Sequence, residues 1–415
     1  MQTTARYSLN LALGFGLLFA CDGTPTETDA GLDQDAAAET DAGPMVDCSG
    51  RPAEAPVTRS EVGMVYDAPR DRLVIYGGNT AASERCAVPD AVVVDEMWAF
   101  HFDCNNWERL NPSGGPGQLR RQATVLDESR GRMLMFGGRG PGSPFGSYVD
   151  EVWAFDLATD SWSEITTTGD TPPGLGEAIA QLDTARDRLL VFGGNPGGFS
   201  GSDGMYALDL NTNVWTEITA AGAPTPRLYH ASTVVGNELI VFGGTGGFNP
   251  PYFNDTYAFD MSADTWRVVT TDAPPRARFG MELVADPDRG RVIMAFGHDA
   301  TNLGNSNDVW ALDLAAGSWT ELHPGDTPNA PAAGMCDFPP DFTIIEDGTP
   351  ERRYSVGLAA AGDHAYFFGG KADCGYLNDV WSMDLATGAW TSVRTSTGGE
   401  VCLRTGRTDC SGLCG

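Results

Sequence analysis

The sequence predicts an all-β fold, a six-bladed β-propeller with four antiparallel strands per blade. Two repeated features and their common period indicate this fold. The first is a glycine pair after an apolar run, with an imperfect sixth copy at Gly297-His298; the five complete pairs are Gly77-Gly78, Gly137-Gly138, Gly193-Gly194, Gly243-Gly244 and Gly369-Gly370. The second is a pair of aromatic residues nine positions apart: Trp98/Trp107, Trp153/Trp162, Tyr206/Trp215, Tyr257/Trp266, Trp310/Trp319 and Trp381/Trp390. Self-similarity at roughly 50 residues indicates blades that bury their faces only against neighbouring blades.

Each repeat contains four strand signals. In the third strand of the second repeat, Trp153, Phe155 and Leu157 alternate with Ala154 and Asp156, which is the period of a β-strand. The glycine pair closes the second strand, because glycine accepts a positive φ and a close backbone neighbour. We expect each outer-strand tryptophan to lie between neighbouring blades.

Six blades follow in order, and each is complete within one stretch of chain, so we expect no strand to be shared at ring closure. Their predicted limits are Val57–Asn111, Leu119–Thr168, Leu175–Ala220, Arg227–Thr271, Arg278–His323 and Tyr354–Arg394. Proline-rich crossovers separate the blades. The second-to-third loops and the crossovers share one face of the propeller, called here the loop face, and all the long insertions project from it.

Three motifs accompany the aromatic spacing: Val241-Phe242-Gly243-Gly244, Asn307-Asp308-Val309-Trp310 and Asn378-Asp379-Val380-Trp381. With these motifs the chain resembles Kelch-repeat propellers over about residues 57 to 394. Kelch propellers that capture acidic peptides use arginine where the inner strands begin. The resemblance therefore suggests a candidate binding rim of Arg59, Arg121, Arg227, Arg278 and Arg353. Tyr252 and Phe253, from the long loop of blade 4, are added to this rim. The alternative is that each arginine pairs with a loop aspartate.

Composition limits the partners. The formal net charge is −30 and Lys371 is the single lysine, so a polyanion would be repelled and we expect no nucleic-acid partner. An acidic surface favours solubility and indicates nothing about the fold.

The N-terminus has the features of an export signal. Arg6 precedes an apolar stretch from Leu9 to Ala20 that is too short to span a bilayer. Leu18-Phe19-Ala20-Cys21 resembles the lipobox of bacterial lipoproteins, which implies lipid attachment at Cys21; an ordinary signal peptide is the alternative. We expect a propeller exported into the bacterial cell envelope, monomeric, with a lipid anchor as its only membrane contact.

The expected domain organisation has four parts. Residues 1–20 form the signal peptide, and residues 21–50 carry the lipidated cysteine and an acidic tether without lysine or arginine, whose composition indicates disorder. Residues 51–397 form the propeller, and residues 398–415 form a cysteine-rich tail.

Nine cysteines, less Cys21, leave eight in an exported protein, which suggests disulfide bonds. The tail contributes Cys402, Cys410 and Cys414. We expect one of them to bond to Cys48 or Cys86 and so link the two ends of the chain, and Cys336 to bond to Cys374. The alternative is that the tail cysteines bond among themselves.

No catalytic constellation is visible in the sequence. The five histidines occupy different strand levels, and no Gly-x-Ser-x-Gly motif or phosphate loop occurs. The aspartate that precedes each third strand is expected to cap a loop rather than bind metal. We therefore predict no metal, no cofactor and a binding or scaffold module that takes a protein or glycan ligand on its loop face. A carbohydrate-active or oxidative enzyme on the same fold is the alternative.

Overall fold

The computed structural model describes residues 54–80, 92–142, 146–247, 251–299, 304–326, 348–372 and 375–397. The helices within these ranges are single 3₁₀ turns, and none of them is long or apolar enough to cross a membrane. They are η1 (Ala68–Arg70), η2 (Glu128–Arg130) and η3 (Pro287–Arg289).

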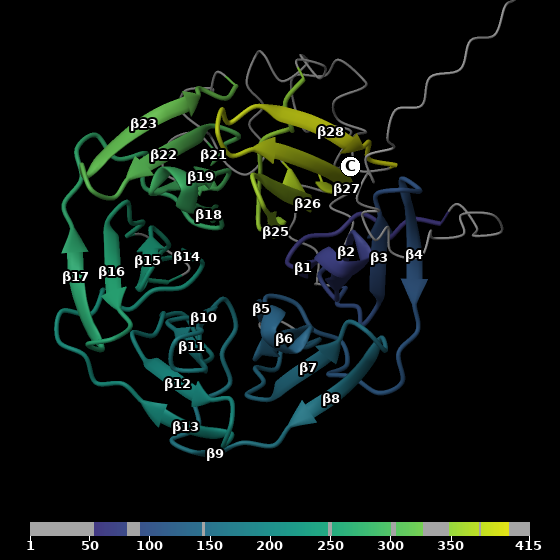
Figure 1. The fold of residues 1–415 in the computed structure, drawn as a ribbon, viewed down its shortest axis with the longest axis horizontal. Helices are drawn as coiled ribbons and strands as arrows, with labels where there is room; N and C mark the ends of the chain where they lie inside the picture. The colour runs from purple at the N-terminus through teal and green to yellow at the C-terminus, as the bar shows by residue number, and fades with distance from the viewer. Residues whose placement is uncertain are drawn as a thin grey trace, which may run out of the picture. The chain divides into compact units, whose positions relative to one another are not determined.

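Six four-stranded antiparallel sheets form a ring, as the sequence predicts (Figure 1). The first three blades are β1 (Gly63–Asp67), β2 (Arg72–Tyr76), β3 (Met97–His101) and β4 (Asn106–Leu110); β5 (Ala123–Asp127), β6 (Arg132–Phe136), β7 (Val152–Asp156) and β8 (Ser161–Ile165); and β10 (Ile179–Asp183), β11 (Arg188–Phe192), β12 (Met205–Asp209) and β13 (Val214–Glu217). Blades 4 to 6 are β14 (Ala231–Val235), β15 (Glu238–Phe242), β16 (Thr256–Asp260) and β17 (Thr265–Val269); β18 (Glu282–Asp286), β19 (Arg291–Ala295), β22 (Val309–Asp313) and β23 (Ser318–His323); and β25 (Gly357–Ala361), β26 (His364–Ala372), β27 (Gly375–Asp384) and β28 (Trp390–Arg394). Figure 1 shows the first strand of each blade nearest the centre and the last strand at the rim.

Every blade is built from one contiguous stretch of chain, which confirms the prediction that no strand is shared at closure. Four short strands add to this plan. β9 (Thr168–Gly169) runs parallel to β13, and β24 (Arg353–Tyr354) extends the last blade beside β26. β20 (His298–Asp299) pairs with β21 (Gly304–Asn305).

The outer-strand tryptophans lie between blades, as predicted. Each ring packs on an aromatic ring at the end of the second strand of the preceding blade, with centroids 4.8–5.4 Å apart. The pairs are Trp107–Phe368, Trp162–Tyr76, Trp215–Phe136, Trp266–Phe192, Trp319–Phe242 and Trp390–Phe296. Because Trp107 of blade 1 contacts Phe368 of blade 6, the same contact also closes the ring.

One repeat was misaligned by one residue in the sequence prediction. The glycine pairs have positive φ in all five complete copies, but the equivalent pair in blade 5 is Phe296-Gly297, with φ of 66° and 111°, and not Gly297-His298. Ala295 occupies the position where other blades carry the aromatic ring, and Phe296 supplies that ring to Trp390 instead. Interblade packing thus accounts for a bulky residue in a backbone region that it rarely adopts.

Arginines on the face opposite the loop face join successive blades. Arg72 donates to Asp67 in its own blade at 2.8 Å, and to the Leu157 carbonyl and Asp160 of the next blade. Arg188 and Arg291 make the equivalent contacts from blades 3 and 5. This face, called here the turn face, is therefore held by buried or half-buried ion pairs.

Candidate functional site

A closed ring of backbone hydrogen bonds surrounds the loop-face end of the central channel. In each blade, the residue two positions before the inner strand has a φ between 52° and 66°. Its backbone N–H donates a hydrogen bond of 2.9–3.3 Å to the carbonyl of the equivalent residue in the preceding blade. The six residues are Glu61, Arg121, Glu177, Tyr229, Gly280 and Ser355. This ring fixes where their side chains stand around the channel mouth, which all six residues line.

Four of the predicted arginines, Arg59, Arg227, Arg278 and Arg353, are buried parts of the loop framework, with side chains at most 2% exposed. Each pairs with a carboxylate two residues before the first aromatic residue of the third strand of its own blade. Each also donates to the backbone carbonyl of the first residue of the glycine pair, or of Phe296 in blade 5. The carboxylate partners, in the same order, are Glu96, Asp255, Asp308 and Asp379, at 2.5–2.8 Å.

This pairing corresponds to the alternative that the sequence left open. Ligand contact by these four arginines stays a prediction, and the burial of their guanidinium groups argues against it. The aspartates were expected to cap loops; Asp255, Asp308 and Asp379 instead accept arginine hydrogen bonds. Blades 2 and 3 carry buried Leu119 and Leu175 at the equivalent position.

Arg121 occupies a different register, two residues further along its blade. Its guanidinium lies between two carboxylates, 2.5 Å from Glu61 and 2.6 Å from Glu177, and 4.7 Å from the centroid of the Tyr229 ring. Arg120 pairs with Glu61 at 2.7 Å and Arg139 with Glu177 at 2.8 Å. These five residues, Glu61, Arg120, Arg121, Arg139 and Glu177, form the charged cluster of the channel mouth.

Two members of the charged cluster, Glu61 and Arg121, have shifted pKa values. Burial alone would raise the pKa of Glu61, but the charges of Arg121 and Arg120 and their hydrogen bonds outweigh it and hold that pKa well below the usual range. Burial would lower the pKa of Arg121, and the two carboxylates raise it further above its ordinary value instead. Glu61 and Arg121 are therefore both ionised at neutral pH.

Partly exposed aromatic rings gather on the other half of the mouth, over blades 4 to 6. Phe279 lies at the centre, with ring centroids 5.1–5.7 Å from those of its four neighbours. The aromatic patch consists of Tyr229, Tyr252, Phe279, His298 and Tyr354. Lys371 places its ammonium 5.7 Å from the Tyr354 ring.

The two predicted aromatic residues have separate positions. Tyr252 stacks on Phe279 and belongs to the aromatic patch. Phe253 instead lies beside the Arg227 guanidinium, 4.6 Å from ring centroid to the carbon of that group, and so covers a framework arginine. Sequence reasoning missed Phe279 and Tyr354, although each follows a framework arginine directly.

The histidines do not converge on one site. His230 is buried against Phe192, and burial, with the charge of Arg227, lowers its pKa to about 3, so its ring is neutral. Burial also lowers the pKa of His298, whose Nδ1 lies 2.7 Å from the Asn305 side-chain oxygen. Within the described residues, no group of His, Cys, Asp or Glu is arranged to hold a metal ion.

Cys104 is the single cysteine in the described ranges, and it is disulfide-bonded. The predicted pairings of Cys48, Cys86, Cys336, Cys374 and the tail cysteines lie outside those ranges.

These features define a six-bladed propeller whose channel mouth is half charged and half aromatic. The KLHDC2/KLHL20/DRC7 Kelch-repeats domain matches residues 39–182 and 142–337, and the Kelch motif matches residues 352–397. The chain belongs to the Kelch-repeat family. Propellers of this family serve as protein-interaction scaffolds, and this chain shares their architecture.

Several curated relatives are similar over part of the chain. Kelch domain-containing protein 10 of Rattus norvegicus is 26% identical over 298 residues, which are 67% of this chain and 69% of the relative. The same protein of Mus musculus is 26% identical over 61% of this chain and 59% of its own length. Acyl-CoA-binding domain-containing protein 5 of Arabidopsis thaliana is 31% identical over 48% of this chain and 30% of its own length. Host cell factor 1 of Rattus norvegicus is 27% identical over 52% of this chain and 11% of its own length.

Proposed function

We propose that this chain is an exported, lipid-anchored Kelch module that binds a protein ligand through the aromatic patch on its loop face. The observation that carries the proposal is the aromatic patch, five partly exposed rings beside the charged cluster. Aromatic side chains are enriched at the centres of protein interfaces, because they bury a large area with few rotatable bonds. The chain's relationship to Kelch domain-containing proteins supports the same class of function.

An exposed aromatic side chain and a cation near the aromatic patch could also contact a protein ligand. Phe199, on the loop face of blade 3, is 68% exposed, and a bridge between Ser200 and Gly247 joins its loop to the loop of blade 4. Lys371 provides a cation close to Tyr354 in an otherwise acidic protein. A ligand segment with apolar and acidic residues would match these groups.

Substituting the patch tests the proposal. We expect Tyr252→Ala with Tyr354→Ala to weaken ligand binding by roughly tenfold to a hundredfold or more, because buried aromatic anchors contribute most of the affinity at interfaces. The ligand would be cross-linked to the wild-type protein in cell envelopes, identified by mass spectrometry, purified and titrated against both proteins. Val214→Ala, which removes a 39% exposed apolar side chain from an outer strand, is the matched control.

Equal affinity of the patch variant and the wild-type protein would contradict the proposal, as would loss of binding in the Val214 variant alone. A glycan ligand is the other candidate, since rings with polar edges also suit sugars. Loss of capture after enzymatic deglycosylation of the envelopes would indicate it.

The anchoring part of the proposal depends on Cys21, which lies outside the described residues. Cys21→Ala is expected to release the protein from the membrane fraction and to abolish labelling by a fatty-acid probe, because acyl chains on that residue would supply the membrane affinity. Cell fractionation with metabolic labelling measures both effects. Unchanged membrane association of the variant would reject the lipid anchor.

A further inference from the structure

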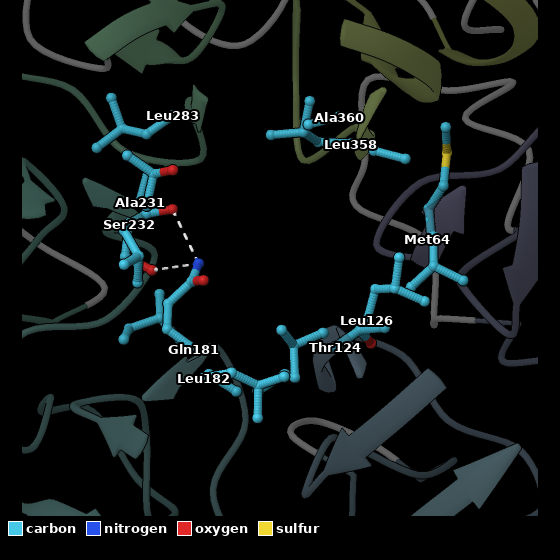
Figure 2. A pocket seen from close by; sticks show the side chains of 18 of the residues that line it. Met64, Thr124, Leu126, Gln181, Leu182, Ala231, Ser232, Leu283, Leu358 and Ala360 are labelled. Carbon is cyan, nitrogen blue, oxygen red and sulfur yellow. Dashed lines mark hydrogen bonds between the residues drawn. The ribbon is translucent and has the colours of Figure 1, made fainter. Parts of the chain in front are cut away.

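The central channel is a cavity of about 1220 Å³ enclosed by the six inner strands (Figure 2). Its walls are mainly short or apolar side chains, and Figure 2 shows Leu126, Leu182, Ala231 and Ala360 around the open space. Ligand sites in proteins are cavities of roughly 300–1,000 Å³, somewhat smaller than this channel, and combine apolar walls with a few polar groups.

Four buried carboxylates near the two ends of the channel have arginine partners. At the loop face, Glu61 and Glu177 both pair with Arg121. At the turn face, Asp127 pairs with Arg132 and Asp183 with Arg188, at 2.9 and 2.8 Å. These groups are already neutralised within the protein.

Glu282 differs from these carboxylates. It is the first residue of β18 and lines the channel two residues beyond the backbone ring. Its backbone pairs with β19, but no residue in the described ranges forms a hydrogen bond or ion pair with its carboxyl group. Burial raises the pKa of Glu282 to about 8, with no charged side chain contributing to the shift.

The propeller fold does not require a carboxyl at this position. The equivalent first residues of the inner strands in the other blades are apolar or lack a side chain: Gly63, Ala123, Ile179, Ala231 and Gly357. Glu282 is half-buried, and a partly desolvated carboxyl without a charged partner is costly, whereas glycine, alanine or isoleucine is sufficient at this position in the other blades. A ligand group that pairs with the carboxylate would offset this penalty.

Other polar groups also line the channel. The Gln181 side-chain NH₂ donates to the Ser232 carbonyl and lies 3.2 Å from the Ser232 hydroxyl oxygen (Figure 2). This pairing leaves the Gln181 amide oxygen as an acceptor. Carboxylate and amide oxygens both suit a ligand that donates hydrogen bonds.

We propose that the channel binds a small organic ammonium ion, with its charge on the Glu282 carboxylate and its hydrocarbon part against the apolar walls. An ammonium group has only donors and a carboxylate only acceptors, and their attraction is stronger where water is excluded. The proposal depends on Glu282 and the apolar walls inside the channel, which Tyr252 and Tyr354 of the aromatic patch do not line, so it does not depend on the proposed protein ligand.

The full chain would be titrated calorimetrically with 3-phenylpropylammonium and with the neutral isostere 3-phenylpropanol. At pH 8.5, Glu282→Gln is expected to weaken binding of the ammonium ion by roughly tenfold or more and to leave the alcohol unchanged, because only the charged pair is lost. Affinity of the wild-type protein for the ammonium ion should fall between pH 9 and pH 6, as Glu282 takes up a proton.

Glu321→Gln, an exposed site on the outer strand of the same blade, is the matched control and is expected to bind both probes like the wild-type protein. Thermal unfolding of each variant verifies that it folds. Equal ammonium binding by the wild-type protein and Glu282→Gln, equal binding of ammonium and alcohol, or no saturable binding would each overturn the proposal.

Discussion

Replacing Trp215 by alanine is expected to lower the free energy of unfolding by about 3–5 kcal/mol. Trp215 is 1% exposed on β13 and packs edge-on against Phe136 of the preceding blade, with ring centroids 5.4 Å apart. Removing the ring leaves a cavity between two sheets whose backbones are held by their own hydrogen bonds and cannot close it. Equilibrium unfolding in guanidinium chloride measures the change.

Trp162→Ala provides the comparison within the same repeat position. Trp162 is only half-buried on β8, although it contacts Tyr76 in the equivalent way, so its loss should destabilise the protein less than the loss of Trp215. A change below about 1 kcal/mol for Trp215→Ala would contradict the interblade role of these rings.

Replacing Glu61 by glutamine is expected to destabilise the protein by about 3–5 kcal/mol, because it leaves buried arginine charge uncompensated. Glu61 is the shared partner of Arg120 and Arg121, whose side chains are 7% and 14% exposed. Glutamine retains the shape and the backbone conformation at this position. Glu238→Gln, in a half-exposed pair with Arg267, is the matched control and should change stability by about 0–1 kcal/mol.

The effect of Glu61→Gln should also depend on pH. The folded-state pKa of Glu61 is lowered, so its contribution to stability is fully present above the ordinary pKa of 4.5 and is lost as pH falls towards the folded-state value. The difference between the wild-type protein and the variant should therefore be constant near neutral pH and shrink below about pH 4.5. Unfolding curves at pH 7 and pH 3 measure it; an equal difference at both would show that the charge pair is not the cause.

The fold was predictable because its signals are local and repeated. Glycine pairs and aromatic spacing mark the strands of each blade. Because the pattern occurs six times, a misplaced boundary in one copy does not change the predicted fold. The misplacement of the glycine pair in blade 5 shows the limit of this approach. Phe296 adopts a positive φ because its ring packs on Trp390, a contact with a residue nearly a hundred positions away that no local pattern contains.

The candidate site was predictable only in part. An arginine at the start of an inner strand has the same local sequence whether it is buried against a loop carboxylate or open to a ligand. Arg59 and Arg121 looked alike, yet Arg59 pairs with Glu96 of its own blade and Arg121 with Glu61 and Glu177 of the two neighbouring blades.

By itself, the sequence determined the number of blades, the order of their strands and the interblade position of the tryptophans. Each of these depends on residues within one repeat, where backbone periodicity and side-chain size decide the outcome. Only the tertiary structure decided the charged cluster, the aromatic patch and the isolation of Glu282. The backbone ring brings together residues from six blades, and whether a side chain there is paired, stacked or alone depends on neighbours from other strands and blades that no single repeat contains.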